Sequence, residues 1–163
     1  MESCGLGCLA HWLISRGEVA NEEKLYRRVR DQVGNYTLEN GRYRVSSAAF
    51  GDRGCQPSVD RAKLHNNDPR KTQKELTDFV VRIMCYEVRG ILDVVHTINN
   101  QEQQYAIDVR PDPRRNIPTE PNNLAHSLII ASPEIPSNPK AVFKKLKIAL
   151  ARLANSNWEI GPE

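Results

Sequence analysis

Arginine and serine side chains between positions 27 and 47 have the composition of a phosphate-binding site. Guanidinium groups donate paired hydrogen bonds to phosphate oxygens, hydroxyl groups add further donors, and small residues let a ligand approach the backbone. The arginines are Arg27, Arg28, Arg30, Arg42 and Arg44, and the hydroxyl groups belong to Ser46 and Ser47. We therefore predict that Arg27, Arg44, Ser46 and Ser47 bind a phosphorylated, nucleotide-like ligand. The alternative is that these arginines are solvated or paired with Glu22, Glu23, Asp31 and Glu39.

A histidine at the start of an apolar segment is the candidate for acid-base catalysis. His126 follows a proline-rich stretch and precedes Ser127-Leu128-Ile129-Ile130-Ala131. An imidazole transfers protons near neutral pH, and Asp108 or Arg110 could be its partner. The alternative is a ring held by a backbone carbonyl at the end of a strand. His65 and His96 are further, weaker candidates.

Basic residues near the end of the sequence suggest a contact surface. Lys140, Lys144, Lys145 and Lys147 occur in a segment with no acidic residue before Glu159. Such a segment could contact an acidic partner or the phosphates of a nucleic acid. The alternative is the solvated face of an ordinary amphipathic helix, since lysines are common there and favour its C-terminal end.

Three metal-capable side chains lie near the beginning of the sequence. Cys4, Cys8 and His11 are spaced by about one helical turn, but a zinc site needs a fourth ligand and the paired C-x2-C spacing is missing. We therefore expect buried thiols, no metal and no cofactor. The apolar run Cys8–Ile14 is interrupted by His11 and resembles neither a signal peptide nor a spanning helix, so we expect a cytoplasmic protein with reduced cysteines.

The composition predicts one folded domain with no dominant charge. The chain has 163 residues, which suits a single domain over residues 1–163. Its net charge is +3, from 23 Lys and Arg against 20 Asp and Glu. This balance is too small for a dedicated nucleic-acid or acidic-membrane binder. Membrane, fibrous and disulfide-rich classes are excluded as well.

Hydrophobic periodicity predicts three helices. Apolar residues recur at helical spacing over 2–16 and over 140–154. A middle helix is expected after Thr72, which with Glu75 forms a capping box, while Leu76, Phe79, Val80 and Ile83 form its apolar face.

Short strands are expected between these helices. Four prolines between 111 and 123 predict an extended loop, and loops of this length are often functional. The segment 25–29 is a strand or a helix end, 58–62 is a strand or a helical turn, and 101–104 is a hairpin connection. Strands are predicted within 43–50, 85–96, 105–110 and, buried on both faces, 126–131. The fold class is therefore α+β, with a mostly antiparallel sheet of four to six strands and N-terminal, middle and C-terminal helices.

Several segments resemble a family of small uncharacterised bacterial proteins. They are Leu25-Tyr26-Arg27-Arg28-Val29, Val45-Ser46-Ser47-Ala48-Ala49-Phe50, Ser58-Val59-Asp60-Arg61 and the segment Pro121 to Ile130. The resemblance spans about 25–131 and implies a bacterial cytosolic protein. A looser similarity to ADP-ribosyl-transferring folds, carried by Arg27, Ser46 and Ser47, implies a dinucleotide site to which Glu87 would add a carboxylate.

Three functions follow from these observations. The first is an interaction or accessory module that binds a protein through the proline-rich loop and the last helix. The second is an enzyme or binder for a phosphorylated nucleotide-like ligand. The third is a nucleic-acid contact through the last helix, and no membrane contact is expected. A cleft shared by Arg27, Ser47 and His126 would favour the second over the first.

Overall fold

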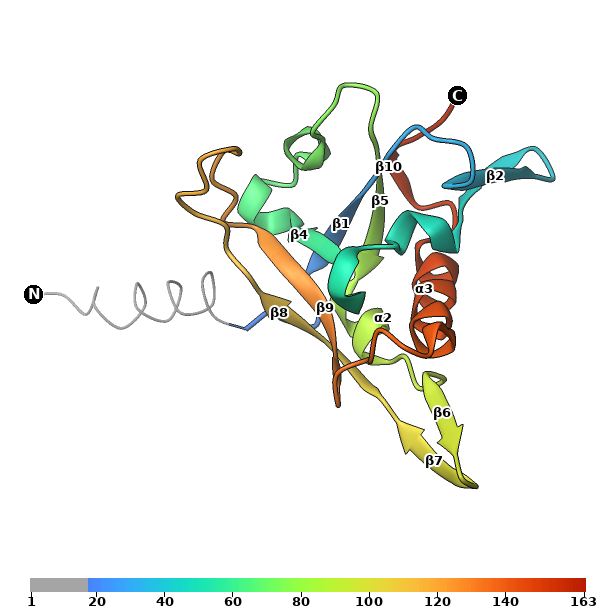
Figure 1. Cartoon of the computed structure of the whole chain (residues 1–163). Helices are drawn as coiled ribbons and strands as arrows, with labels where there is room; N and C mark the ends of the chain where they lie inside the picture. The colour runs from blue at the N-terminus through green and yellow to red at the C-terminus, as the bar shows by residue number, and fades with distance from the viewer. Residues whose placement is uncertain (1–17) are drawn as a thin grey trace, which may run out of the picture.

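A six-stranded antiparallel sheet forms the centre of the molecule (Figure 1). The structure is a computed structural model and describes residues 18–163. The strand order is β10-β5-β1-β4-β9-β8, and the bounds are β1 Lys24–Val29, β4 Ser58–Arg61, β5 Phe79–Met84, β8 Ala106–Pro111, β9 His126–Ser132 and β10 Trp158–Ile160. Two hairpins extend from it, β2 Tyr36–Glu39 with β3 Arg42–Val45 and β6 Val95–Ile98 with β7 Gln101–Gln104. The predicted α+β class with antiparallel pairing is confirmed.

One face of the sheet packs on the long helix α3, Lys140–Ala154. Its buried side chains are Val142, Phe143, Leu146, Ala149, Leu150 and Ala154. They join apolar residues of the sheet, including Leu25, Val81 and Ile129, in one large core cluster. The predicted C-terminal helix is confirmed with the bounds expected for it.

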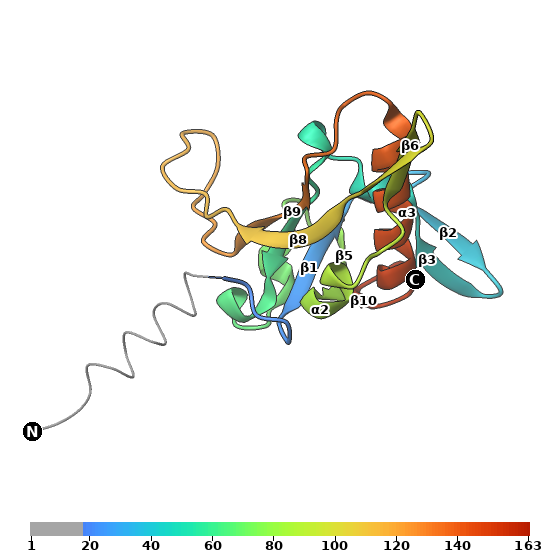
Figure 2. The same cartoon turned by 90° about the horizontal axis from the view of Figure 1, so that it is seen from below.

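The opposite face of the sheet carries loops and short 3₁₀ helices. Successive residues of a strand point to opposite faces, so Leu25 enters the α3 core while Tyr26 packs with Ala62 and Val80 in a second, small cluster. Two 3₁₀ helices, η3 Ala62–His65 and η4 Pro69–Thr72, follow β4 on this side. In Figures 1 and 2, the segment between β8 and β9 projects from the sheet on the side away from α3.

The prediction of a helix after Thr72 is wrong. Thr72 closes η4, the next residues form a turn in which Leu76 is exposed, and 79–84 is strand β5. Apolar residues at 76, 79, 80 and 83 fit a helix, but Val80 and Val81 are β-branched, and β5 pairs with β1 along its whole length. The tertiary pairing decides between two patterns that the local sequence permits.

Smaller differences concern the segments around this sheet. The segment 85–96 does not form the strands expected there, because Cys85–Arg89 is the short helix α2 and β6 begins at Val95. Gln101–Gln104 is strand β7, whose turn lies at Asn99-Asn100, where both residues have positive φ. The residues after Val45 form the 3₁₀ helix η1, Ser47–Phe50, which packs on α3.

The predicted burial of the 126–131 strand is wrong. Residues 126–130 of strand β9 alternate between half-buried and buried, and Ser132 is exposed, so the strand is not buried on both faces. Within residues 18–163 there are two α-helices, α2 and α3, and the predicted helix over 2–16 lies outside the described residues. None of the described helices combines the length and apolar character needed to cross a membrane.

Candidate functional site

A row of polar groups crosses three neighbouring strands on the face opposite α3. Antiparallel register places Tyr26 of β1 beside Asp60 of β4, and Asp60 beside His126 of β9. Cross-strand partners point to the same face, so these three side chains share one surface of the sheet. This row forms the floor of the candidate site.

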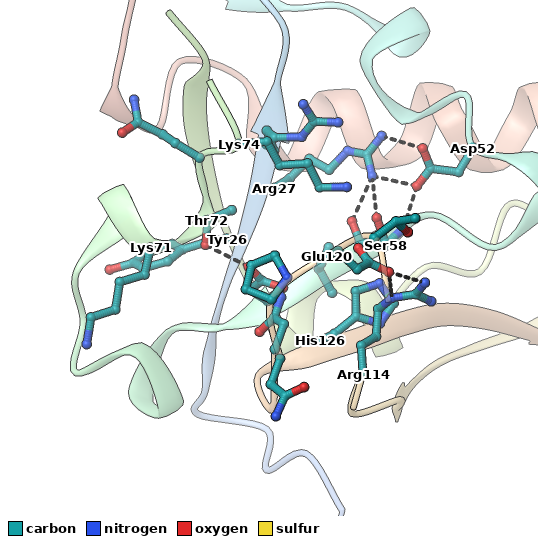
Figure 3. A pocket seen from close by; sticks show the side chains of 18 residues that line it. Tyr26, Arg27, Asp52, Ser58, Lys71, Thr72, Lys74, Arg114, Glu120 and His126 are labelled. Carbon is teal, nitrogen blue, oxygen red and sulfur yellow. Dashed lines mark hydrogen bonds and ion pairs between the residues drawn. The ribbon is translucent and has the colours of Figure 1, made fainter. Parts of the chain in front are cut away.

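Two walls rise from this floor and enclose a cleft of about 660 Å³. One wall consists of η4 and the residues after it, and the other is the proline-rich segment 112–125 between β8 and β9 (Figure 3). The lining residues are Tyr26, Arg27, Arg28, Asp52, Ser58, Val59, Asp60, Lys71, Thr72, Gln73, Lys74, Arg114, Thr119, Glu120, Pro121, Asn122, Asn123 and His126. The loop that the sequence marks as functional by its length is therefore a wall of the cleft.

Asp60 joins the floor to both walls. Its Oδ2 accepts hydrogen bonds from Thr72 Oγ1 at 2.9 Å and His65 Nε2 at 3.0 Å, and its Oδ1 accepts one from Asn123 Nδ2 at 3.0 Å. The residue is only 6% exposed. A buried carboxylate must be compensated by donors, and here the donors come from η3, η4 and the 112–125 segment. Asp60 thus fixes the distance between the walls.

Arg27 lies at one end of the cleft in a fork of internal hydrogen bonds. Its Nη1 and Nη2 donate to the two carboxylate oxygens of Asp52 at 2.6 and 2.9 Å, while Nε and Nη2 donate to Ala49 O. Nη1 also donates to Ser58 O at 2.7 Å. Burial tends to raise the pKa of Asp52, but Arg27 and the backbone N–H of Ser58 outweigh it, so the pKa lies below its ordinary value. Arg27 therefore stabilises the cleft more than it offers donors to a ligand.

Arg28 makes fewer hydrogen bonds within the protein than Arg27 does. Its Nη1 donates to Asp78 Oδ2 at 3.2 Å, and within residues 18–163 its other guanidinium N–H groups have no partner. Asp78 also accepts the backbone N–H groups of Lys74 and Glu75, each at 2.9 Å. These contacts lower its pKa despite its burial and order the turn that carries Lys74.

The charges of the lining are unequal. Five cationic side chains, Arg27, Arg28, Lys71, Lys74 and Arg114, face three carboxylates, Asp52, Asp60 and Glu120. Arg114 pairs with Glu120, its Nε and Nη2 donating to Oε1 at 2.9 and 2.5 Å. Among the described residues, neither Lys71 nor Lys74 has an ion-pair partner, and both are exposed. With Arg27, Arg28 and Arg114 in ion pairs, Lys71, Lys74 and the Asp60 carboxylate remain, so the lining keeps a net positive charge.

The two walls act on each other electrostatically. The hydrogen bond from Arg114 is the main cause that lowers the pKa of Glu120, and the charges of Lys74 and His126 add to it. Lys74 belongs to the η4 wall, whereas Glu120 belongs to the facing segment. An anion entering between them would meet cations from both sides.

His126 lines the cleft next to Arg114 and Glu120 (Figure 3). Its Nδ1 lies 2.9 Å from the backbone oxygen of Asp112 and 3.1 Å from the Oδ2 of the same residue. The sequence suggests Asp108 or Arg110 as partner, but Asp108 instead accepts a hydrogen bond from Arg89 at 2.7 Å. The backbone contact that the alternative reading predicts is present, together with access to the cleft.

Three residues predicted to bind the ligand do not line this cleft. Arg44 of β3 is exposed and pairs with Glu39 at 3.4 Å. Ser46 Oγ donates to Gly34 O, and Ser47 begins η1. These residues belong to the β3–η1 region, in which η1 packs on α3 and Tyr43 O accepts a hydrogen bond from Trp158 of β10. Of the predicted set, the structure brings together only Arg27 and His126.

The basic residues of α3 lie on the other side of the sheet. Lys145 Nζ donates to Val95 O at 2.5 Å, and Lys147 Nζ lies 5.0 Å from the centre of the Phe143 ring. Lys140 and Lys144 remain exposed without an ion pair among the described residues. Lys140, Lys144, Lys145 and Lys147 are thus separate from the cleft, and contact with a nucleic acid or a protein through them stays a prediction.

Other candidates have structural roles or fall outside the description. Glu87 accepts the backbone N–H of Met84 at 3.3 Å at the start of α2 and does not line the cleft. Cys55 and Cys85 are free thiols, and burial raises the pKa of Cys85 to about 11. Cys4, Cys8 and His11 lie outside the described residues. Within 18–163 there is no group of three or more residues that could hold a metal ion.

Sequence reasoning missed Asp60, Lys71, Lys74 and Arg114. Asp60 stands in the Ser58–Arg61 segment, where an acidic residue between Val59 and Arg61 looks like an exposed strand position. The lysines follow Pro69 in a polar stretch typical of surface loops. The one usable signal was the proline-rich segment, which contains Arg114.

Comparison of the chain with protein-family models, with curated proteins and with solved structures gives no match. The resemblance to a small bacterial family therefore stays a prediction, and the case for a function depends on the geometry of the cleft.

Proposed function

We propose that the cleft binds a phosphorylated small molecule. The observation that carries this proposal is the presence of Lys71 and Lys74, without ion pairs among residues 18–163, in a cleft whose lining also includes His126 and Arg28. Cations without ion pairs in the lining of a concave site favour an anionic ligand. The proposal keeps the second of the three sequence-based functions and moves its site.

Phosphate suits the donors of this cleft better than a carboxylate. Arg28 has guanidinium N–H groups to spare, Arg114 uses only Nε and Nη2 for Glu120, and each lysine has three ammonium donors. Such a set can satisfy several oxygens of one phosphate group. A carboxylate has only two oxygens and would leave part of the positive charge uncompensated.

The lining gives little support for stacking a nucleobase. Among the described residues that line the cleft, only Tyr26 has a six-membered aromatic ring. It is 2% exposed, and its hydroxyl donates to Asn67 O at 3.2 Å. Base recognition in proteins commonly uses an exposed aromatic face. We therefore expect the phosphate group, rather than the base, to dominate affinity.

Calorimetry with matched lysine variants tests this proposal. Wild-type protein is titrated with ribose 5-phosphate, AMP and ADP, and with adenosine and ribose as uncharged controls. The phosphorylated compounds should bind with an affinity that falls as salt increases, and the controls should not bind. The K71A/K74A variant should lose at least about tenfold in affinity, which corresponds to about 1.4 kcal/mol.

The K140A/K144A variant removes the same charge from α3 and should bind as the wild type does. If both double variants lose affinity equally, the effect is one of net charge and the cleft is not the site. If no phosphorylated compound binds at millimolar concentration, the proposal is wrong. Binding of a protein through the 112–125 segment and α3 stays a separate prediction.

A further inference from the structure

The hydrogen bonds of His126 determine which of its ring nitrogens carries the proton. Nδ1 faces two oxygens of Asp112, the backbone carbonyl at 2.9 Å and Oδ2 at 3.1 Å. A carbonyl oxygen only accepts, so Nδ1 must donate. In the neutral ring, Nε2 then carries the lone pair and is the atom able to take up a proton.

The remaining nitrogen is available to a ligand. His126 lines the cleft, its side chain is 14% exposed, and Nε2 has no partner among residues 18–163. The charged groups near the ring are Asp112, Arg114 and Glu120 from the 112–125 segment and Asp60 from β4, and Lys74 of the facing wall acts on the same Glu120 carboxylate (Figure 3). A carboxylate that orients one nitrogen while the other faces a site is the arrangement of a general base.

We propose that the cleft hydrolyses phosphodiesters, with His126 Nε2 as the general base. This proposal rests on the proposed function, because the ester must first be held by Lys71, Lys74 and Arg28. A water molecule attacks phosphorus and gives its proton to Nε2 while the new P–O bond forms. The bond from phosphorus to one ester oxygen breaks, and the departing alkoxide takes a proton from solvent. The imidazolium returns its proton to solvent, so one diester and one water yield a monoester and an alcohol.

A diester benefits more from this base than a monoester does. Phosphoryl transfer from monoesters passes through a loose transition state in which the nucleophile contributes little. A diester carries one negative charge and depends more on an activated nucleophile. The cations of the two walls then stabilise the charge that develops on the phosphoryl oxygens. Asp112 is a positioning residue, because it acts through the ring of His126.

Hydrolysis of bis(p-nitrophenyl) phosphate by the H126N variant tests the role of the histidine. Asparagine places an amide N–H near the position of Nδ1, so it keeps a donor for Asp112 while removing the base. Wild-type protein should release p-nitrophenolate, and H126N should lower kcat about 100-fold or more, the range expected for general-base catalysis. The H96N variant, changed on β6 outside the cleft lining, should retain the wild-type rate.

The dependence of kcat on pH separates a base from a structural histidine. The wild-type rate should rise with pH along a curve for one proton, because the base must be unprotonated, and H126N should lose that curve. The D112N variant should shift the curve, since a neutral amide replaces the carboxylate beside the ring.

The experiments distinguish a failure of the catalytic proposal from a failure of the binding proposal. Phosphorylated compounds that bind without any diester hydrolysis by wild-type protein would overturn the catalytic proposal and leave the binding proposal intact. Equal kcat in wild-type protein and H126N would overturn it as well. Absence of both binding and turnover would contradict the proposed function itself.

Discussion

At the scale of single residues, the ion pair between Arg27 and Asp52 makes the stability of the folded protein depend on pH. The pKa of Asp52 is lowered in the folded protein, mainly through Arg27 and Ser58 acting against burial. A group with a lowered folded-state pKa contributes stability above its ordinary value of 3.8, and this contribution is lost as pH falls through the folded value. Asp78 and Glu120 act in the same direction.

We expect the D52N variant to lose part of this dependence. Its free energy of unfolding, measured by urea titration between pH 5 and pH 2, should fall less steeply than that of the wild type, because one linked proton is removed. D93N changes an aspartate that is 69% exposed and lies 3.9 Å from Arg152, so it should follow the wild-type curve. If the free energy of unfolding falls equally steeply with pH in D52N and in the wild type, protonation of Asp52 is not linked to unfolding and the prediction is wrong.

Asp60 gives a second prediction at this scale. An asparagine there keeps one acceptor oxygen but turns an NH₂ group towards donors that now have no acceptor. We expect D60N to lower the free energy of unfolding by about 1–3 kcal/mol. It should also weaken phosphate binding more than D93N does, since both walls lose their shared anchor. Unchanged binding in a folded D60N would mean that the walls are held by other contacts.

At the scale of elements, helix α3 contributes many of the buried core residues, and none of its residues lines the cleft. Leu146 is fully buried in the main cluster, whereas Leu76, in the turn before β5, is 96% exposed. We expect L146A to lower the free energy of unfolding by about 2–5 kcal/mol through lost burial and a cavity. The same leucine-to-alanine change at position 76 should alter it by less than about 0.5 kcal/mol. Denaturant unfolding of the two variants measures the difference.

The same elements show what the sequence could predict. The 140–154 helix has one apolar stripe and no competing pattern, so both its existence and its bounds follow from periodicity. The segment 76–83 fits two periods, and only its neighbours β1 and β10 decide for a strand. Residues after Val45 look like a continuing strand, but they turn into η1, where Ala49 and Phe50 are buried. Long-range pairing is absent from local sequence, so these errors have one cause.

The candidate site was predictable only in part for a related reason. His126 and the proline-rich segment stand out because each is chemically unusual where it occurs. Arg27 was also identified, but the sequence does not reveal that Asp52, 25 residues away, accepts hydrogen bonds from both of its Nη atoms and that Ala49 and Ser58 accept the others. Lys71 and Lys74 matter only because the fold places them in the lining of the same cleft as Asp60 and Glu120. Their role depends on which cations remain unpaired, and that is a property of the folded chain.

At the scale of the whole molecule, the sheet separates two tasks. Its α3 side contains the large apolar cluster, while its other side contains the polar floor and the two walls. Every buried polar side-chain atom of the described residues has a hydrogen-bond partner, so burial of these polar groups leaves no donor or acceptor unsatisfied. Substitutions in the walls can therefore alter charge or shape without disturbing the packing that stabilises the fold.

Strand β10 has a consequence for how the protein forms during synthesis. It is the last strand of the sheet along the chain, yet it pairs with β5, and Trp158 packs on Phe79 and donates to Tyr43 O at 2.9 Å. While a ribosome is still translating the residues before Trp158, the outer edge of β5 has no neighbour and offers its backbone groups to other nascent chains. This edge is therefore completed only after Trp158–Ile160 has been translated, and we expect a chain stalled before position 158 to be prone to self-association.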